Sequence, residues 1–456
     1  MNLSKTMCEE ALSCLMGLSI FSGVQKGPMV AAFEKLIRQV AQNEIEPYSL
    51  AKAWADFASA FVQGNQKETF YMKLVALILA DENTFTLCAE RGEFREKSLI
   101  ASLVRSDLRR LSIIGDFDVP ALALSIAGIL WEAGCQDCAK LIEEGVQSLG
   151  ELKTQNEALD KGAFPYVLLE AHNVCEFAAF VRKNGAGMLS THVFFSWDSQ
   201  RGLTPALNPD AIRLENLSGY EGQRKTLVDN ALRFLEGRGG VNNMLLYGDR
   251  GTGKSATVKA LCNSYASRGL RLVEVRKRDL NELPKILSTL SMRGLYFILF
   301  IDDLSFERQD ESFNEVKALL EGGIETKPAN VAIYATSNRR HLVKEESRDR
   351  PDGAAAAASM RSGDMRAFDT MQEQLSLADR FGVTVIFASP SQAEYLKIAE
   401  FIARERGIVQ DGAGEADLTA FRDNAVRWER WFNGRSPRTA RQYVDWLAGG
   451  ADFPWE

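Results

Sequence analysis

The first part of the chain repeats apolar residues with the spacing of amphipathic helices. Up to about residue 185, apolar side chains recur three and four positions apart, and polar residues separate one run from the next. This spacing places the apolar residues on one face of a helix, so we expect residues 1–192 to form an all-α N-terminal domain. The predicted helices are 29–42, 50–63, 68–80, 96–111, 120–133 and 135–149.

The apolar run 11–24 has the length of a signal-peptide core. Glu9 and Glu10 precede it, however, where a signal peptide carries positive charge, and no clear cleavage site of small residues follows. We therefore predict a core helix over 11–24. The apolar run 120–131 is too short to span a bilayer, so we expect a cytoplasmic protein with no membrane partner.

Beyond residue 213, short apolar runs alternate with helical segments. This alternation is typical of a parallel sheet covered on both faces. We predict an α/β core over 213–390, joined to the first domain by a linker over 193–212 and followed by a C-terminal helical lid over 391–456. The predicted strands are 244–247, 271–275, 296–302, 331–336 and 383–387, with helices after the first three and near Gln374. An alanine-rich insert at 345–371 is interpreted as a mobile loop, with a helix as the alternative.

The composition, with 46% hydrophobic and 25% charged residues, is that of a folded globular protein. A formal net charge of −7 gives no basic field over the whole surface, so contact with nucleic acid would need a local basic patch. The seven cysteines are scattered and odd in number, as in reduced cytoplasmic proteins. Cys135 and Cys138 have metal or redox spacing, but they lack a second pair and a nearby histidine, which favours helix-face thiols over zinc.

The segment from Gly248 to Ser255 has the pattern G-x-x-x-x-G-K-[ST] of a phosphate-binding loop. It follows a predicted strand and precedes a predicted helix, which is the context that this loop requires. In such a loop, backbone N–H groups surround the phosphates, Lys254 reaches the β- and γ-phosphates, and the Ser255 hydroxyl is placed to ligate Mg²⁺. The predicted nucleotide-binding residues here are Gly248, Asp249, Arg250, Gly251, Thr252, Gly253, Lys254, Ser255 and Ala256.

Polar residues end two later strands. Asp302 and Asp303 follow the apolar run 296–301. In phosphate-loop ATPases, the first acid at this strand end holds the Mg²⁺ shell and the next orients the attacking water. We therefore predict Asp302 as a metal-binding residue together with Ser255, and Asp303 as a catalytic residue. Asn338 follows the next apolar run and is placed to hydrogen-bond the γ-phosphate or the attacking water.

Taken together, these residues resemble the AAA+ ATPases, and the resemblance covers about 214–447. The segment 214–220 looks like the family's adenine-side segment, which implies that Gly219 and Tyr220 lie near the base.

Two arginines resemble further AAA+ elements. The segment 377–382 is similar to the family's arginine-finger segment, which implies that Arg380 reaches the γ-phosphate of a neighbouring subunit. The segment 434–440 resembles the family's second sensor, which implies that Arg438 contacts the nucleotide of its own subunit. For both arginines, a surface ion pair is the alternative.

More closely, the phosphate-binding loop and the runs 302–307 and 335–342 look like a poorly characterised AAA+ family catalogued only as a domain of unknown function. Membership would imply ATP binding and would leave the client open. The chain departs from the broad AAA+ pattern at Asp303, where many members have Glu. Because Asp is one methylene shorter, the water must lie closer, or Glu307 must assist. Replication initiators and helicase loaders also carry paired aspartates here, so hydrolysis stays an expectation.

The residues after the second predicted strand bear on the client. Protein-threading members of the AAA+ family have an aromatic–aliphatic–Gly loop there, whereas this chain has Arg276, Lys277 and Arg278. The basic residues argue against an unfoldase and suit a nucleic-acid or acidic partner, with a solvated turn as the alternative. No further domain follows the lid in this sequence, so a sequence-specific initiator is not expected.

These features predict an Mg²⁺-dependent ATPase with ATP and Mg²⁺ as cofactors. We expect it to act as a homo-oligomer that remodels or loads an unidentified protein or nucleic-acid client. The alternative is an ATP-binding switch or scaffold that hydrolyses ATP negligibly and displays the helical N-terminal domain.

Overall fold

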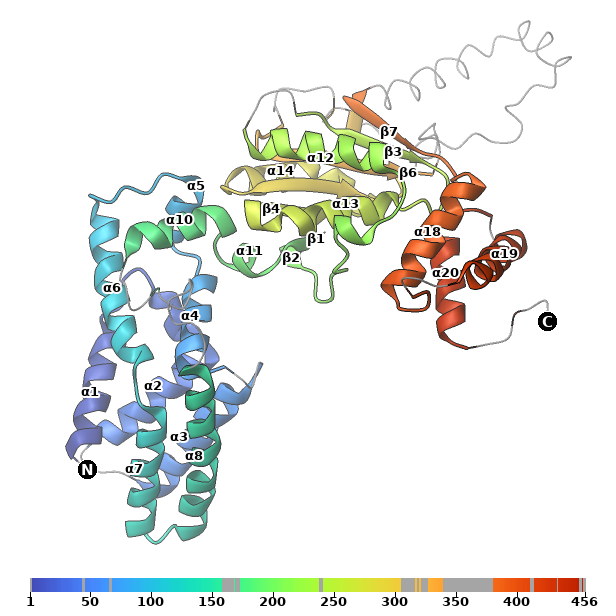
Figure 1. Ribbon diagram of the computed structural model, residues 1–456. Helices are drawn as coiled ribbons and strands as arrows, with labels where there is room; N and C mark the ends of the chain where they lie inside the picture. Colours follow the sequence, from blue (N-terminus) through green and yellow to red (C-terminus); the bar gives the residue numbers. More distant parts are fainter. Residues whose placement is uncertain are drawn as a thin grey trace, which may run out of the picture. The chain divides into compact units, whose positions relative to one another are not determined.

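The computed structural model contains two compact units, Met1–Thr191 and His192–Glu456 (Figure 1). The residues that the structure describes are 2–42, 46–64, 68–157, 168, 173–237, 241–304, 316–317, 320, 327–338, 380–410, 414–432, 434–450 and 453. The insert expected at 345–371 and the helix expected near Gln374 lie outside these residues, and the helix expected from Glu311 lies within them only at 316–317 and 320, which are helical.

A seven-stranded sheet in the order β2-β1-β4-β5-β6-β3-β7 forms the centre of the second unit. All neighbouring strands are parallel except β1 and β2. All seven residues of β6 are buried, because helices and loops cover both faces of the sheet, as parallel sheets require. The strands are β1 (Phe194–Asp198), β2 (Gly202–Pro205), β3 (Met244–Gly248), β4 (Leu270–Glu274), β5 (Tyr296–Ile301), β6 (Val331–Ser337) and β7 (Val383–Phe387).

Strands β1 and β2 lie within the range 193–212, for which the sequence predicts a linker. β1 pairs in parallel with β4, and β2 returns antiparallel to β1. Phe194, Phe195 and Trp197 are buried, and the indole N–H of Trp197 donates to the Glu282 carboxylate at 2.9 Å. The apolar side chains of this segment therefore add two strands to the sheet, and the prediction of an irregular linker is wrong for them.

Helices complete the second unit. Tyr395, Phe421, Trp428 and Tyr443 form the core of a small bundle that follows the last strand. This bundle is the predicted helical lid, and together with the parallel sheet it confirms the predicted α/β fold with a helical C-terminal part. The helices are α12 (Glu221–Leu235), α13 (Lys254–Tyr265), α14 (Leu283–Ser291), α18 (Gln392–Glu405), α19 (Glu415–Trp431) and α20 (Pro437–Ala448), and the 3₁₀ helices are η2 (Leu214–Asn216), η3 (Ala266–Arg268) and η4 (Lys277–Glu282).

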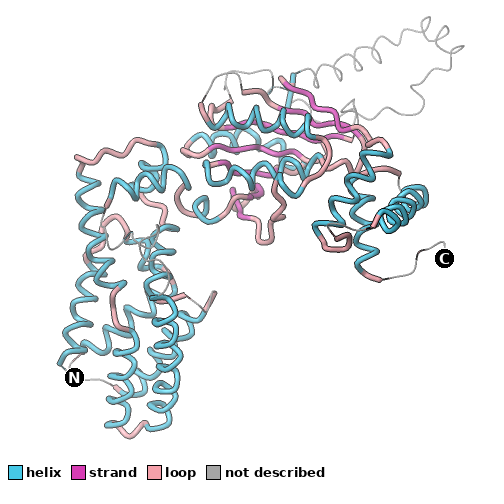
Figure 2. Tube along the Cα trace, viewed as in Figure 1, coloured by secondary structure: helices cyan, strands magenta, loops and turns pink. Residues whose placement is uncertain are grey.

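The described part of the first unit consists of helices joined by loops, with no strand (Figure 2). Each of the six helices predicted between 29 and 149 is present, and α5, α10 and α11 are additional. Phe33 lies at the centre of one aromatic cluster, with the rings of Phe57, Phe70 and Phe117 at 5.8, 4.8 and 5.0 Å between centroids. The helices are α1 (Asn2–Met16), η1 (Ser22–Lys26), α2 (Pro28–Ala41), α3 (Pro47–Val62), α4 (Phe70–Ala80), α5 (Thr84–Arg91), α6 (Leu99–Gly115), α7 (Val119–Glu132), α8 (Gln136–Glu157), α10 (Val174–Asn184) and α11 (Met188–Thr191).

Among the described residues, no single helix is both long enough and apolar enough to cross a membrane. Helices α6 and α7, bent by 54° at their junction, meet that test only as a pair, by length and composition. All seven cysteines are free thiols.

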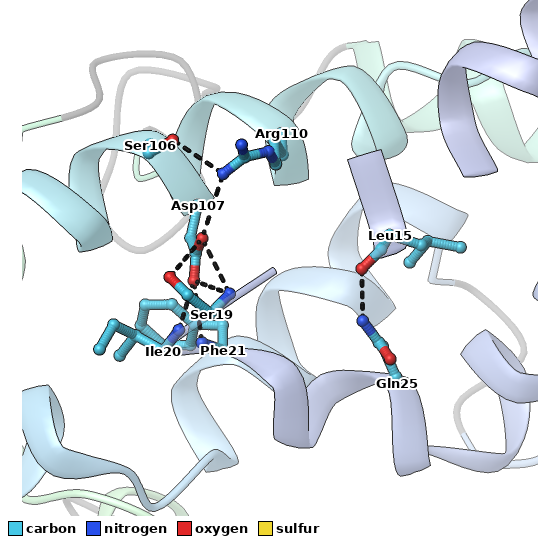
Figure 3. A network of polar contacts seen from close by, with 8 residues as sticks. All are labelled: Leu15, Ser19, Ile20, Phe21, Gln25, Ser106, Asp107 and Arg110. Carbon is cyan, nitrogen blue, oxygen red and sulfur yellow. Dashed lines mark hydrogen bonds and ion pairs between the residues drawn. The ribbon is translucent and has the colours of Figure 1, made fainter. Parts of the chain in front are cut away.

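One buried carboxylate fixes the chain after the first helix. Asp107 of α6 is fully buried, and its Oδ2 atom accepts hydrogen bonds from the backbone N–H groups of Ser19, Ile20 and Phe21 at 3.0, 2.7 and 3.1 Å (Figure 3). Arg110 lies one turn along α6, with its Nη1 atom 3.6 Å from Asp107 Oδ1. A buried carboxylate is stable only when donors satisfy its oxygens. Three backbone amides and the Ser19 hydroxyl, which donates to Oδ1 at 3.1 Å, do so here, and Arg110 supplies the opposite charge.

The same contact corrects the helix predicted over 11–24. Helix α1 ends at Met16, and the 3₁₀ helix η1 begins only at Ser22. In between, the amides of residues 19–21 bond to Asp107 instead of to carbonyl groups one helical turn earlier. The helix therefore ends where the Asp107 side chain accepts from the N–H groups that would otherwise continue it.

Replacing Asp107 with Ala should destabilise the first unit by about 3 kcal/mol, because three backbone N–H groups lose an acceptor that is fully buried. Chemical denaturation of the full chain would measure this change, and amide hydrogen exchange should accelerate at residues 19–21. Asp56→Ala is the matched control, since Asp56 forms only an exposed ion pair with Lys35 and should contribute less than about 0.5 kcal/mol. Equal effects of the two substitutions would contradict the role given to Asp107.

Candidate nucleotide-binding site

The predicted phosphate-binding loop leaves β3 at Gly248 and enters helix α13 at Lys254. Gly248 has a φ of 142°, and a Cβ atom there would lie 2.1 Å from the carbonyl oxygen of Phe387 in β7. Glycine is therefore required for the loop to turn beside the neighbouring strand. The first N–H groups of α13 have no acceptor within the helix, so this end of α13 attracts an anion.

The Lys254 ammonium lies inside the loop. It is buried, and its Nζ atom donates to the carbonyl oxygens of Gly248 at 2.9 Å and Asp249 at 2.6 Å. Burial lowers the pKa of Lys254, while the carboxylates of Asp249, Asp302 and Asp303 act in the opposite direction. The loop thus holds a cation beside the helix end, where a phosphate group would compete with the two carbonyl groups for it.

Ser255 and Asp302 meet at the same edge of the sheet. The Ser255 hydroxyl donates to Asp302 Oδ1 at 2.6 Å. Both groups offer oxygen ligands, and Mg²⁺ is commonly bound by one or two carboxylates together with substrate phosphates. No group of three or more His, Cys, Asp or Glu side chains forms a metal cage in the described part of the chain. The donor set therefore fits an Mg²⁺ ion that arrives with a triphosphate and shares its oxygens.

Asp303 and Asn338 form a second polar pair beside this one. The Asn338 Nδ2 atom donates to Asp303 Oδ1 at 2.7 Å. Asp303 has a φ of 51°, in the left-handed region, which Asp and Asn tolerate better than most residues. Both side chains are near the solvent, Asp303 being exposed and Asn338 half-buried. The arrangement places a carboxylate and an amide together where a water molecule has access to both.

Parallel pairing explains why the residues that follow β5 meet those at the end of β6. Asp302 and Thr336 lie 34 positions apart in the sequence, and Asp303 and Asn338 lie 35 positions apart. Ile301 of β5 pairs with Ala335 of β6, so the residues after the two strands lie side by side. Thr336, which the sequence analysis did not single out, donates from its hydroxyl to Asp302 Oδ1 at 2.5 Å. Its only signal in the sequence is its place in the small polar run that ends in Asn338.

A second overlooked residue, Ser389, connects the loop to the start of the lid. Its backbone N–H and its hydroxyl both donate to Asp249 Oδ2, at 2.8 and 2.7 Å. These hydrogen bonds lower the pKa of the Asp249 carboxyl below its ordinary value. Ser389 lies just after β7 and just before α18. The second residue of the phosphate-binding loop is thereby tied to the junction between sheet and lid.

The predicted adenine-side residues also contact this junction. The Tyr220 hydroxyl donates to the carbonyl oxygen of Ala388 at 2.7 Å, and its ring centroid lies 5.1 Å from that of Phe387. Burial raises the pKa of Tyr220 to about 12. Gly219 has a φ of 76°, and a Cβ atom there would lie 2.9 Å from the side chain of Ile398 in α18. Gly219 and Tyr220 therefore lie between the sheet and the first lid helix.

The structure brings Arg438 to the phosphate-binding loop. It is the second residue of α20, and its backbone N–H donates to the Gly251 carbonyl oxygen at 3.2 Å. Its guanidinium is exposed, and its charge contributes to lowering the pKa of Lys254. Two cations thus lie close to one another, an arrangement that a polyanionic ligand would stabilise.

Arg380, in contrast, lies away from the phosphate-binding loop. β3 and β7 are parallel, with Met244 paired to Val383 and Gly248 paired to Phe387. The loop follows Gly248, whereas Arg380 precedes Val383, so a five-residue strand of about 16 Å separates them. Arg380 belongs to the opposite edge of the sheet, and Glu307, the expected assistant of Asp303, lies outside the described residues.

The three basic residues noted in the sequence are all exposed. They follow β4: Arg276 precedes η4, and Lys277 and Arg278 are its first two residues. The Arg278 Nε atom lies 3.6 Å from the Asp279 carboxylate. Because β4 is parallel to β5 and β6, these side chains lie at the same edge of the sheet as the phosphate-binding loop.

The match to a known protein family covers most of the second unit of the chain. A sequence profile of the family described as "Protein of unknown function (DUF815)" matches residues 190–451, which is more than half of the chain. No curated protein matches the sequence.

Two solved structures show the level of likeness to known proteins. A RuvB variant from Thermotoga maritima aligns with 18% identity and a TM-score of 0.33, over 53% of this chain and 67% of that one. The AAA domain of FIGL-1 in complex with ADP aligns with 17% identity and a TM-score of 0.34, over 54% of this chain and 75% of that one. Likeness at this level transfers no activity. By the profile match and by the phosphate-binding loop, parallel sheet and helical lid of its second unit, the chain belongs to the DUF815 family and has an AAA+ fold.

Proposed function

We propose that this chain is an Mg²⁺-dependent ATPase that binds ATP in the loop from Gly248 to Ser255 and hydrolyses it at the interface between two subunits. One observation carries the proposal: the Ser255 hydroxyl and the Asp302 carboxylate lie 2.6 Å apart, directly beside a loop that already encloses the Lys254 ammonium. A triphosphate with its metal ion suits this place, because a cation, the N-terminus of a helix and two oxygen ligands meet there.

In this proposal, the triphosphate replaces the loop carbonyl groups as the partner of Lys254, while the N–H groups at the start of α13 surround it. Ser255 and Asp302 hold Mg²⁺, which neutralises charge on the β- and γ-phosphates when it is bound. Gly219 and Tyr220 contact the base, and Arg438 contacts the phosphates from the lid. The contacts of Tyr220 with Ala388 and of Arg438 with Gly251 support these assignments, because they bring both segments to the loop.

For hydrolysis, Asp303 accepts a proton from the water that attacks the γ-phosphorus, and the bond from this phosphorus to the bridging oxygen of ADP breaks. Asn338 orients Asp303 or the water through its side-chain amide. The hydrogen bond between Asn338 and Asp303 supports this pairing. The same bond also favours a second function, an ATP-binding switch with negligible hydrolysis, since it occupies one oxygen of an acid that is already one methylene shorter than Glu.

Arg380 is assigned to the site of a neighbouring subunit, because its place at the far edge of the sheet puts it out of reach of its own loop. The protein would thus act as a homo-oligomer on a protein or nucleic-acid client that contacts Arg276, Lys277 and Arg278. A cytoplasmic location is part of the proposal and is supported by seven cysteines that are all free thiols.

Lys254→Ala should weaken ATP binding by about 100-fold, because it removes the charge that faces the phosphates. Titration of the purified full chain with a fluorescent ATP analogue would measure the affinity. Lys259→Ala removes an ammonium from the same helix outside the loop and should bind as wild type. If Lys254→Ala keeps wild-type affinity, the proposed site is wrong.

Asp303→Asn removes the carboxylate while retaining a side chain that accepts the left-handed backbone conformation. We expect kcat to fall by about 100-fold or more with ATP affinity unchanged. Steady-state phosphate release is the measurement, and Asp229→Asn, which alters a surface ion pair on α12, is the control. Equal near-background rates for wild type and Asp303→Asn, with ATP binding intact, would favour the switch over the enzyme.

Arg380→Ala should also lose turnover, and mixing it with Asp303→Asn should restore part of it. In mixed oligomers, an intact Asp303 of one subunit can meet an intact Arg380 of the next, which gives about a quarter of the wild-type sites if subunits mix at random. Phosphate release from co-purified mixtures tests this, with exposed Arg233 changed to Ala as the control. No recovery in verified mixed oligomers would show that Arg380 acts elsewhere.

A further inference from the structure

Thr336 connects the two acids of the proposed site through a single buried hydroxyl. Its side chain is only 2% exposed near the end of β6. Its Oγ1 atom lies 2.5 Å from Asp302 Oδ1 and 2.9 Å from the backbone nitrogen of Asp303. The carbonyl oxygen of Thr336 also accepts from the N–H of Leu304 at 2.7 Å. One residue of β6 therefore holds three consecutive residues that follow β5.

The directions of these hydrogen bonds follow from the groups involved. A hydroxyl has one proton to donate, and the Asp302 carboxylate can only accept, so Thr336 donates to Asp302. The Asp303 N–H can only donate, so it donates to a lone pair of the same oxygen. The hydroxyl thereby fixes the Asp302 carboxylate and the peptide bond between Asp302 and Asp303 together. A hydrogen bond to a carboxylate at this distance is charge-assisted and stronger than one between neutral groups.

Both acids depend on this arrangement. Asp302 Oδ1 also accepts from Ser255, and the lone pairs of the Ser255 oxygen stay available to a metal ion while its proton is donated to Asp302. Thr336 is the second donor to the same carboxylate oxygen and fixes it from β6. Asp303 has a φ of 51°, a conformation that costs free energy for a residue with a side chain. The bond from its N–H to Thr336 is formed in that conformation and opposes its relaxation.

We propose that Thr336 is a positioning residue for the metal ion and the attacking water. It touches neither of them. It holds the Asp302 carboxylate where Mg²⁺ is bound and holds the backbone from which Asp303 reaches the water. Groups that orient metal ligands in this way commonly contribute 10- to 100-fold to metal affinity or activity. The inference rests on the proposed function, since it assigns Thr336 to the same site.

Three variants of the full chain separate this role from a merely structural one. Thr336→Val removes the hydroxyl and keeps the shape, whereas Thr336→Ser keeps the hydroxyl. Thr384→Val makes the same replacement at an exposed position of β7 in the same sheet and serves as the control. A structural role alone would lower the stability of the protein without altering its response to Mg²⁺.

The first measurement needs no ligand. Hydrogen exchange of the Asp303 amide in the nucleotide-free protein should accelerate about 10-fold or more in Thr336→Val, because its acceptor is lost. The second measurement is ATP affinity with EDTA and with increasing Mg²⁺. In Thr336→Val, we expect the affinity in EDTA to stay within about 2-fold of wild type and the gain in affinity from Mg²⁺ to fall by about 10-fold. Thr336→Ser should recover most of that gain, and Thr384→Val should match wild type in both measurements.

Two results would overturn the inference without touching the proposed function. One is a folded Thr336→Val protein whose gain from Mg²⁺ equals that of wild type, and the other is a Thr336→Ser protein as impaired as Thr336→Val. A wild-type protein that binds no ATP under any of these conditions contradicts the proposed function and this inference together. The two failures are thus distinguished by whether the wild-type chain binds ATP.

Discussion

The parallel pairing of β5, β6, β3 and β7 is the constraint on which the candidate site depends. Parallel strands present their carboxyl ends at one edge of the sheet, and the observed register places Ile301 beside Ala335 and Gly248 beside Phe387. Four chain segments that are distant in sequence therefore end within hydrogen-bonding distance of one another. A shift of one residue between β5 and β6 or between β6 and β3 would turn the neighbouring side chains to opposite faces and separate Ser255, Asp302 and Asn338.

The lid shares this edge through contacts with the loop itself. Asp249 accepts two hydrogen bonds from Ser389, Arg438 donates its N–H to Gly251, and Tyr220 bonds to Ala388. Each contact joins a residue that would surround a nucleotide to the junction between sheet and lid or to α20. These hydrogen bonds link the lid directly to the loop. Under the proposed function, they give ATP binding a physical route to the helical bundle.

The parts of the fold that the sequence predicts are those with local signals. Apolar runs of four to seven residues between turns identify β3 to β7, and the glycines and Lys254 identify the loop. The overlooked features arise from contacts between distant residues. Ser389 meets Asp249 across 140 positions, and Thr336 meets Asp302 across 34, so neither pairing is visible without the order of the strands.

The errors have the same origin. The helix predicted over 11–24 ends early because Asp107, 88 positions from Ser19, captures the amides that would continue it. The range 193–212 looks irregular, since glycine and prolines interrupt it, yet its aromatic residues add β1 and β2 beside β4. In both cases, a contact with a distant residue determines the local structure, although the local sequence pattern predicts a different one.

The central claim is that a triphosphate and its metal ion occupy the space between the loop of β3, the acids of β5 and the start of α20. An experimental density map of the protein with a non-hydrolysable ATP analogue and Mg²⁺ tests it most directly. We predict phosphate density at the N–H groups of α13, the Lys254 ammonium turned from the Gly248 carbonyl group to that density, and a metal ion between Ser255 and Asp302. Clear density for the analogue elsewhere, with Lys254 still bonded to the loop carbonyl groups, would contradict the account.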